Sequence, residues 1–264
     1  MSQLARYEAN EGVATITLDD ATVNCYTYEM NRQVDECILK ARFDTSVHVI
    51  VFRGAGEKFF CAGANINMLQ KADPVFKYYF CLHANETLSR LEQTPKLTIA
   101  AINGHCVGGG LEYAMACDLR IARTGGGKIG LPEVSLGVLP GTGGTQRLAR
   151  LVGKSKSIEI MTEGKNFEFE EAMQLGIVNK IFEGNNADEF MRKVYDYARQ
   201  FCPPHKASMA VGHIKRSVQS GLEVPLEYGL AIERELQAKL FSSADAKIGL
   251  NAYVEKQKPQ FTGK

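Results

Sequence analysis

The sequence predicts an α/β fold that continues into a helical C-terminal region. Apolar runs rich in β-branched residues, typical of buried strands, alternate with segments of helical apolar spacing over the first two thirds of the chain. Beyond about residue 187 the pattern is helical only. A chain of 264 residues can bury one large core and still carry an appendage. We therefore expect a core over residues 1–200 and a helical region over 201–264, with the boundary near residues 202–205.

The first half of the chain is expected to begin with a β-hairpin, because two apolar segments flank a polar turn at residues 10–12. Asp73 and Pro74 are residue types preferred at an N-cap and at the first helical position. The predicted strands of this half are 4–7, 13–18, 47–52 and 97–102, the predicted helices are 26–41 and 73–92, and residues 58–67 are expected to form a loop.

Glycine-rich turns separate the elements of the second half. Residues 125–127 form an expected flexible turn, and residues 141–144 open a helix that runs to residue 151. The predicted strands are 119–123 and 177–182, and the predicted helices are 154–163, 168–175, 187–201, 205–220, 225–242 and 243–257. The last two helices are rich in apolar residues, so they either pack on a neighbouring subunit or fold back on their own core.

Composition excludes several classes of function. With 31 basic and 30 acidic residues, the net charge is +1, which gives no electrostatic case for nucleic acid or an anionic membrane as the main partner. No segment approaches 18 uninterrupted apolar residues, so we expect no membrane span. The seven cysteines contain no CxxC pair, so we expect neither a disulfide framework nor a structural metal site. A reducing cytoplasm is the expected compartment, and the N-terminal residues lack the pattern of a secretory signal.

Three consecutive glycines, Gly108 to Gly110, join a predicted strand to a helix that carries Glu112 in its first turn. Glycines let the backbone approach a bound group, and the free N–H groups at a helix N-terminus attract negative charge. The stretch therefore fits an oxyanion site with an acid or base beside it. From this stretch alone, the simpler interpretation is an ordinary glycine turn followed by an acidic residue that the helix dipole favours.

Glu133 lies in an otherwise apolar stretch, where a carboxylate has to be paired, hydrogen-bonded or partly protonated. If it shares a site with Glu112, the two protonation constants separate, which supplies one acid and one base near neutral pH. Ala64 follows bulky residues and a glycine, so its backbone N–H is a candidate second oxyanion donor beside Gly109. Spacing alone does not decide whether these residues meet.

Several other candidates have simpler structural explanations. Asp118 is expected to be a structural residue at a helix-to-strand junction, and His83 and His105 have no partners at metal-ligand spacing. The chain has no GxSxG for nucleophilic catalysis, and its glycine turns do not fit GxGxxG after the first strand of a βαβ unit.

Four groups of motifs resemble the crotonase (enoyl-CoA hydratase/isomerase) superfamily, and they cover nearly the whole chain in order. The first is Phe60-Cys-Ala-Gly-Ala-Asn-Ile66, and the second is the stretch from Ile99 to Asp118, which contains Asn-Gly-His-Cys-Val-Gly-Gly-Gly-Leu-Glu. The third is the stretch from Gly130 to Leu148, which contains Leu-Pro-Glu-Val-Ser-Leu-Gly-Val-Leu-Pro-Gly-Thr-Gly-Gly-Thr-Gln-Arg. The fourth is Leu240-Phe-Ser-Ser-Ala-Asp245 together with Ala252-Tyr-Val-Glu-Lys256.

The resemblance implies a spiral of ββα units, a C-terminal helical trimerisation region and a hexamer built as a dimer of trimers. It places Glu112 and Glu133 as catalytic carboxylates, and Ala64 and Gly109 as the oxyanion hole for a thioester carbonyl. The implied substrate is an acyl-CoA, with coenzyme A as part of the substrate and no metal or other cofactor. The residues it implies for substrate and CoA binding are Ala62, Ala64, Asn65, Ile66, Asn67, Gly109 and Tyr26, with Tyr253 and Lys256 reaching in from a neighbouring subunit.

Enoyl-CoA hydratase is the activity that the resemblance favours, because family members that only isomerise double bonds keep the carboxylate at 133 and replace the one at 112. The alternatives are an isomerase or another acyl-CoA enolate reaction, such as hydrolysis or decarboxylation. A non-catalytic binding protein on the same scaffold is a further alternative, against which the balanced charge and the Glu pair argue.

Two departures from the family pattern affect the expected pocket. The common Gly-Ala-Asp is Gly63-Ala-Asn65 here, which keeps the backbone donor and removes a charge. The N-terminal Asn-Ala-Leu is Asn24-Cys-Tyr26, which puts a bulkier, polar-tipped ring near the expected acyl entrance.

Overall fold

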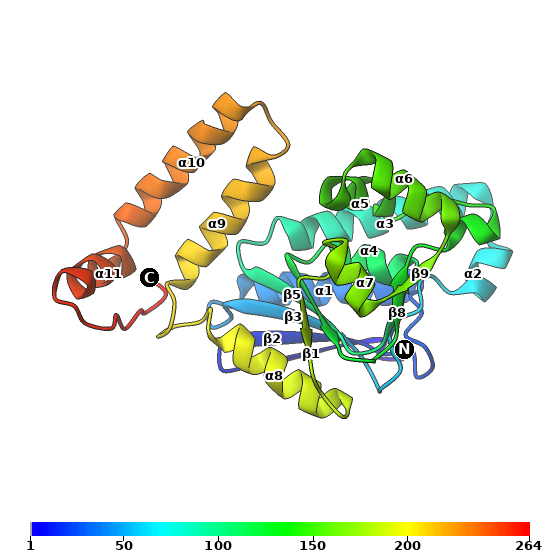
Figure 1. Ribbon diagram of the computed structural model, residues 1–264, viewed down its shortest axis with the longest axis horizontal. Coiled ribbons are helices and arrows are strands. Elements are labelled where there is room, and N and C mark those ends of the chain that lie inside the picture. Colours follow the sequence, from blue (N-terminus) through cyan, green and yellow to red (C-terminus); the bar gives the residue numbers. More distant parts are fainter. Residues whose placement is uncertain (1) are drawn as a thin grey trace.

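The computed structural model describes residues 2–264 and contains two β-sheets surrounded by helices (Figure 1). The larger sheet has the order β1-β2-β3-β5-β7-β10, and the smaller sheet has the order β4-β6-β8-β9. The strands of the larger sheet are β1 (Ala5–Asn10), β2 (Val13–Leu18), β3 (Val49–Gly54), β5 (Leu97–Ile102), β7 (Leu119–Arg123) and β10 (Lys180–Phe182). Those of the smaller sheet are β4 (Phe59–Cys61), β6 (His105–Val107), β8 (Lys128–Gly130) and β9 (Asn166–Glu168).

The chain passes repeatedly from the larger sheet to the smaller sheet and then into helices. The strands β3, β5 and β7 each lead directly into a short strand, β4, β6 and β8, and the strands of each set are parallel neighbours. Helices follow each pair: α2 (Ile66–Lys71) and α3 (Pro74–Glu92), then α4 (Gly109–Met115), then the 3-10 turn η1 (Glu133–Leu136) with α5 (Gly144–Val152) and α6 (Lys154–Glu163). This is the predicted spiral of ββα units.

Helices on both faces of the larger sheet bury it. On one face α1 (Tyr28–Phe43) packs against β1, β2 and α3, and its buried side chains join the main core. On the other face α8 (Ala187–Arg199) covers β2, β3, β5, β7 and β10, with Phe190 and Val194 fully buried in a second cluster. The short helix α7 (Phe169–Gln174) connects β9 to the edge of the larger sheet.

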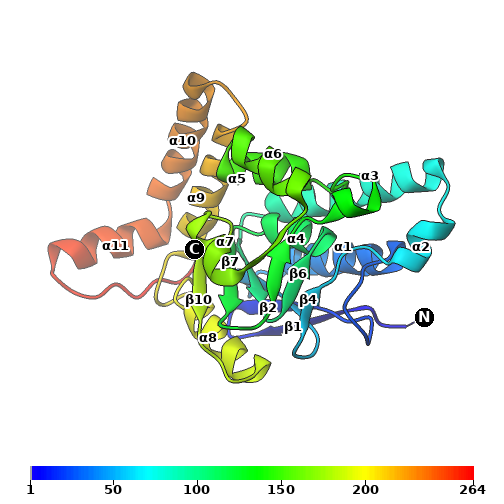
Figure 2. The same cartoon turned by 45° about the vertical axis from the view of Figure 1, so that its right-hand side comes forward.

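The three C-terminal helices project from this core (Figures 1 and 2). They are α9 (Ser208–Gly221), α10 (Leu226–Phe241) and α11 (Ala244–Val254). Helices α9 and α10 pack against each other, with Gly221 and Gly229 allowing a close approach. Large apolar side chains on these helices face solvent in the single chain, including Leu222, Leu226 and Tyr253.

The long strands agree best with the sequence prediction: β2, β5 and β7 have the predicted bounds. The four strands of the smaller sheet were not predicted, because three residues are too few to show a period of two. Accordingly, the expected loop at 58–67 contains β4 and the start of α2. The strand expected at 177–182 is shorter, because Ile177 and Val178 bond to Ala172 rather than to a strand.

No helix within residues 2–264 is both long and apolar enough to cross a membrane. Over the same residues, no group of three His, Cys, Asp or Glu side chains is arranged to hold a metal ion. The seven cysteines are all free thiols.

Candidate active site

The candidate site lies where three neighbouring strands of the smaller sheet end. β4, β6 and β8 run parallel and side by side, so the segments that follow them emerge at the same edge. Ala64 follows β4, Gly109 follows β6, and Glu133 follows β8. The topology therefore brings together residues that are far apart in the sequence.

Two backbone N–H groups at this edge are free to bind a ligand. Ala64 is held in an isolated β-bridge with Tyr26, in which Tyr26 N donates to Gly63 O at 3.0 Å and Asn65 N donates to Tyr26 O at 3.0 Å. Gly109 is the first residue of α4. Within residues 2–264, neither the Ala64 nor the Gly109 N–H has a protein acceptor. The two segments touch, since a Cβ built on Gly63 would lie 3.3 Å from Gly109 N.

Each of the three consecutive glycines is required for a different reason. Gly108 has φ 56° and ψ −131°, a conformation that side chains other than hydrogen disfavour. A Cβ on Gly109 would lie 2.3 Å from the Tyr26 ring, and one on Gly110 would lie 2.1 Å from Cys61 O. The run of glycines therefore lets α4 start in contact with both β4 and Tyr26.

Glu112 is buried, and its carboxylate is held by the glycine turn that precedes α5. Thr142 N and Gly144 N donate to Oε1 at 2.8 and 2.7 Å, and the Thr142 hydroxyl donates to Oε2. Burial raises the pKa of Glu112, while these three hydrogen bonds favour its ionised form and oppose the rise. The side chain is therefore fixed in position as an acceptor.

Glu133 has the opposite surroundings. Its Oε2 is buried without a hydrogen-bond partner among residues 2–264. The pKa of Glu133 is raised to about 7, mainly by burial and also by the nearby Glu112 carboxylate. A hydrogen bond from the backbone N–H of Glu133 and the charge of Lys77 act in the opposite direction and lower this pKa. Glu133 can thus carry a proton near neutral pH.

These groups line one cavity of about 110 Å³. Ala64, Gly109, Glu112 and Glu133 all contribute to its wall. The rest of the wall is mainly apolar and includes Ile66, Leu69, Leu136, Val138 and Leu139. Among residues 2–264, Lys77 is the only cationic side chain that lines this cavity. The arrangement combines two oxyanion donors with two carboxyl groups of different protonation behaviour.

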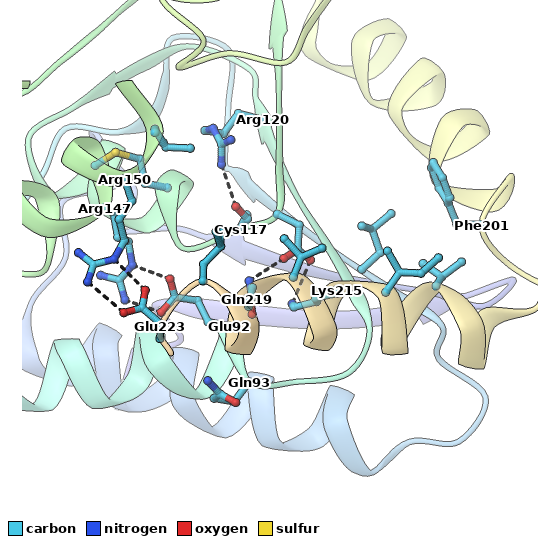
Figure 3. Close-up of a pocket in the computed structure, with 18 of the residues that line it drawn as sticks. Glu92, Gln93, Cys117, Arg120, Arg147, Arg150, Phe201, Lys215, Gln219 and Glu223 are labelled. Atoms are coloured by element: carbon cyan, nitrogen blue, oxygen red, sulfur yellow. Dashed lines mark hydrogen bonds and ion pairs between the residues drawn. The ribbon is translucent and has the colours of Figure 1, made fainter. Parts of the chain in front are cut away.

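A larger cavity of about 850 Å³ lies between α9 and the core, and it has a different character (Figure 3). Three ion pairs line it: Arg147 with Glu92 at 2.6 Å, Arg150 with Glu223 at 2.8 Å, and Lys215 with Asp118 at 3.0 Å. Asp118 also accepts from the Thr98 backbone N–H at 2.7 Å, which makes it the structural residue that the sequence predicts. Among residues 2–264, each acidic side chain that lines this cavity is therefore held in an ion pair, unlike Glu133 in the smaller cavity.

Comparison with known proteins agrees with this geometry. Residues 8–264 match the family described as enoyl-CoA hydratase/isomerase. The chain belongs to this family.

Individual relatives of this hydratase/isomerase family member cover almost its whole length. A short-chain-enoyl-CoA hydratase from Clostridium acetobutylicum is 35% identical over 247 residues, which is 93% of this chain and 92% of the relative. A mouse mitochondrial methylglutaconyl-CoA hydratase is 33% identical, covering 97% of this chain and 81% of the relative. The crystal structure of an enoyl-CoA hydratase from Geobacillus kaustophilus superposes with a TM-score of 0.95 at 43% identity, covering 100% of this chain and 98% of the other.

The remaining predicted site residues of this family member lie at different distances from the Glu pair. Ala62, Ile66 and Tyr26 line the cavity. Asn65 caps α2 by accepting from Met68 N at 3.0 Å, and Asn67 is exposed on the same helix. Tyr26 is only 2% exposed, so its ring forms part of the cavity floor.

Tyr253 and Lys256 lie far from the cavity of their own chain. Tyr253 is on α11 and Lys256 follows it, at the opposite end of the molecule from α2 (Figure 2). A role in CoA binding would therefore require a second copy of the chain, as the sequence resemblance implies.

Sequence reasoning missed the residues that hold Glu112. It treated residues 141–144 only as the start of a helix, whereas Thr142 and Gly144 provide three hydrogen bonds to the carboxylate. The signal was present, because free N–H groups at a helix N-terminus commonly bind an anion. Lys77 was also missed, since its position in α3 carries no motif.

Proposed function

We propose that this protein is an enoyl-CoA hydratase, which adds water across the 2,3 double bond of a 2-enoyl-CoA thioester. The observation that carries the proposal is the presence of Glu112 and Glu133 on one cavity with the free N–H groups of Ala64 and Gly109. Hydration needs a base for water, an acid for the α-carbon and stabilisation of an enolate oxygen, and the cavity supplies all three.

The oxyanion hole would bind the thioester carbonyl. When water attacks the β-carbon, negative charge moves to the carbonyl oxygen, and the N–H groups of Ala64 and Gly109 stabilise it. Loss of one such donor typically costs about 3 kcal/mol of transition-state stabilisation. Both donors are backbone groups of tightly packed segments, so little reorganisation is needed when the charge develops.

The two carboxyl groups divide the proton transfers between them. Glu112 acts in its ionised form, which three hydrogen bonds stabilise, and removes a proton from water as the oxygen bonds to the β-carbon. Glu133, with a pKa of about 7, delivers its proton to the α-carbon, and the double bond becomes a single bond. Exchange with solvent then restores the starting protonation states. General acid–base catalysis of this kind contributes roughly 10²–10⁴-fold.

A short acyl group is the substrate that the cavity supports best. Its volume of about 110 Å³ and apolar wall suit a small hydrocarbon chain. The short-chain specificity in the name of the Clostridium relative points the same way. The positive charge of Lys77 in the cavity wall favours a second candidate substrate, whose acyl group carries a distal carboxylate. The methylglutaconyl group in the name of the mouse relative is an acyl group of this kind.

We also propose that the protein assembles as a hexamer, a dimer of trimers, through its C-terminal helices. Apolar side chains such as Leu222 and Leu226 are 79% and 76% exposed in the single chain, which is unfavourable unless a partner covers them. In this assembly Tyr253 and Lys256 would contact the CoA of a neighbouring subunit.

The seven free thiols suit a reducing compartment, and we infer that the protein is located in the cytoplasm.

Enzyme assays with a series of acyl-CoAs test the proposal. Crotonyl-CoA should lose the absorbance of its conjugated thioester when the protein is added, and the rate should fall as the acyl chain lengthens. Faster turnover of an enoyl-CoA with a distal carboxylate would favour the second candidate. If no 2-enoyl-CoA reacts while a 3-enoyl-CoA is isomerised, the protein is an isomerase and the hydratase proposal is wrong.

A further inference from the structure

Tyr26 occupies a central position beneath the proposed site. Its ring stacks on Phe80 of α3, with centroids 5.6 Å apart, and lies 5.4 Å from the Tyr113 ring of α4. The ring also fills the space that the side chain of any larger residue at position 109 would occupy. One buried ring therefore contacts two of the helices that surround the cavity and the residue that supplies an oxyanion donor.

The backbone of Tyr26 supports the second oxyanion donor. Its N–H and C=O bond to Gly63 and Asn65, the residues on either side of Ala64. A shift of Tyr26 would therefore move the Ala64 N–H as well as the surface against which Gly109 packs.

The hydroxyl of Tyr26 connects it to Glu112. It lies 3.3 Å from the Thr142 hydroxyl, which in turn bonds to Glu112 Oε2. An ionised carboxylate only accepts, so the Thr142 proton points to Glu112 and the Thr142 oxygen accepts from Tyr26. The order Tyr26 to Thr142 to Glu112 is thus fixed whenever Glu112 is the base, and successive bonds of this kind strengthen one another.

We propose that Tyr26 is a positioning residue that holds Glu112, through Thr142, in register with the two oxyanion donors. The inference rests on the proposed hydratase function, because Glu112 is the base of that reaction. It differs from the role in binding CoA that the sequence resemblance implies for Tyr26. Substrate does not have to touch the hydroxyl, since the hydroxyl acts on Thr142.

Other charged and titratable groups lie near Glu112 and its partners. Tyr113 in α4, Arg147 in α5 and Glu133 in η1 interact with Glu112, Cys61 in β4 interacts with Tyr26, and Lys77 in α3 interacts with Glu133. The variants below leave all of them in place except Tyr113, which is changed only in the control.

Tyr26→Phe tests the proposal, because it removes the hydroxyl and keeps the ring against Gly109. We expect kcat for crotonyl-CoA to fall roughly 3- to 10-fold with KM changed less than about twofold. The acidic limb of the kcat–pH profile should move up by roughly half a pH unit, because a carboxylate that loses hydrogen-bond support keeps its proton to higher pH. An unchanged pH profile would overturn the proposal.

Tyr113→Phe is the matched control. Tyr113 is equally buried and lies beside Tyr26, but its hydroxyl donates to Asn31 and has no link to Thr142. This variant should lower thermal stability without moving the pH profile. An equal shift in both variants would mean that any lost buried hydroxyl has this effect, which would contradict the proposal.

Thr142 provides the second test. Thr142→Ser keeps the hydroxyl and should retain the wild-type profile, whereas Thr142→Val removes it and should shift the acidic limb further than Tyr26→Phe. In the Thr142→Val background, Tyr26→Phe should have no additional effect on that limb. Additive effects would show that Tyr26 acts independently of Thr142 and would sink the proposal.

Infrared difference spectroscopy separates this inference from the proposed function. The protonated-carboxyl band of Glu112, identified as the band lost in Glu112→Gln, can be titrated without any reaction. Tyr26→Phe should raise the midpoint of that titration even if the physiological reaction is not hydration. An unshifted midpoint in a protein that does hydrate crotonyl-CoA would contradict only the role of Tyr26.

Discussion

Glu112 and Glu133 are chemically identical residues that their surroundings make different. Three hydrogen bonds converge on Glu112, whereas Glu133 Oε2 has no partner among residues 2–264. Burial raises the pKa of both residues, but only Glu112 has hydrogen bonds that oppose the rise and favour the carboxylate. The different roles that we propose for the two residues therefore follow from their neighbours.

The two carboxyl groups should respond differently to removal of their charge. Glu112→Gln should lower hydration by roughly two or more powers of ten, because water loses its base. Glu133→Gln should abolish both hydration and exchange of the α-proton, whereas exchange should suffer less in Glu112→Gln. The measurement is turnover together with deuterium incorporation at the α-carbon. Near wild-type hydration by Glu112→Gln would mean that this residue is a structural acid.

Glu133 should also make the protein less stable at higher pH. Its pKa is raised from 4.5 to about 7, so from about pH 4.5 upward the unfolded chain ionises while the folded protein retains the proton. The free energy of unfolding therefore falls as the pH rises, until the pH passes about 7. Glu133→Gln should therefore raise Tm by about 6 °C at pH 8 and leave it nearly unchanged near pH 4.5. Equal Tm changes at both pH values would contradict the assignment.

Among the elements, α2 is the one whose stability bears most directly on the site. This six-residue helix has no buried residue, and its first turn depends on the Asn65 cap, one residue after Ala64. Only the partly buried Met68 and Leu69 of α2 pack against the core, and so short a helix gains little from packing. We therefore expect the cap to fix both α2 and the Ala64 donor.

Asn65→Ala should destabilise the protein by about 0.5–2 kcal/mol and raise KM for enoyl-CoA by roughly two- to fivefold. Asn186→Ala is the matched control, because Asn186 caps α8 in the same way by accepting from Glu189 N at 2.8 Å. The control should lose comparable stability with KM unchanged. Chemical denaturation and steady-state kinetics give the two quantities. Parallel KM increases in both variants would argue against a local effect of Asn65.

The elements that the sequence predicted are those with enough residues to show a period. β5 and its neighbours in the larger sheet are continuous apolar runs, and Asp73 with Pro74 marks the start of α3 as predicted. The site could not be assembled from spacing, because the meeting of Glu112 and Glu133 depends on the order of three-residue strands. Motif resemblance supplied these residues. The hydroxyl chain from Tyr26 to Glu112 depends on side-chain packing, which neither approach reaches.

At the scale of the whole molecule, we propose that the C-terminal helices determine how the chain associates. We expect sedimentation to show a species about six times the 29.1 kDa chain mass. Leu222→Glu should shift this species towards smaller assemblies, since a charge cannot be buried in an apolar contact without a partner. Phe43→Glu in α1 is the control, because Phe43 and Leu222 are both 79% exposed in the single chain. A wild-type monomer at micromolar concentration would contradict the assembly.

The contact between Tyr26 and Gly109 also constrains how this chain can have evolved. Because the tyrosine ring fills the space of a Gly109 side chain, a large ring at position 26 is compatible only with glycine at position 109. A lineage that acquires Tyr26 can no longer accept alanine at 109 until the ring is replaced by something smaller. Substitutions at these two positions, 83 residues apart, are therefore coupled, and alanine at 109 becomes acceptable only after the ring at 26 has been replaced.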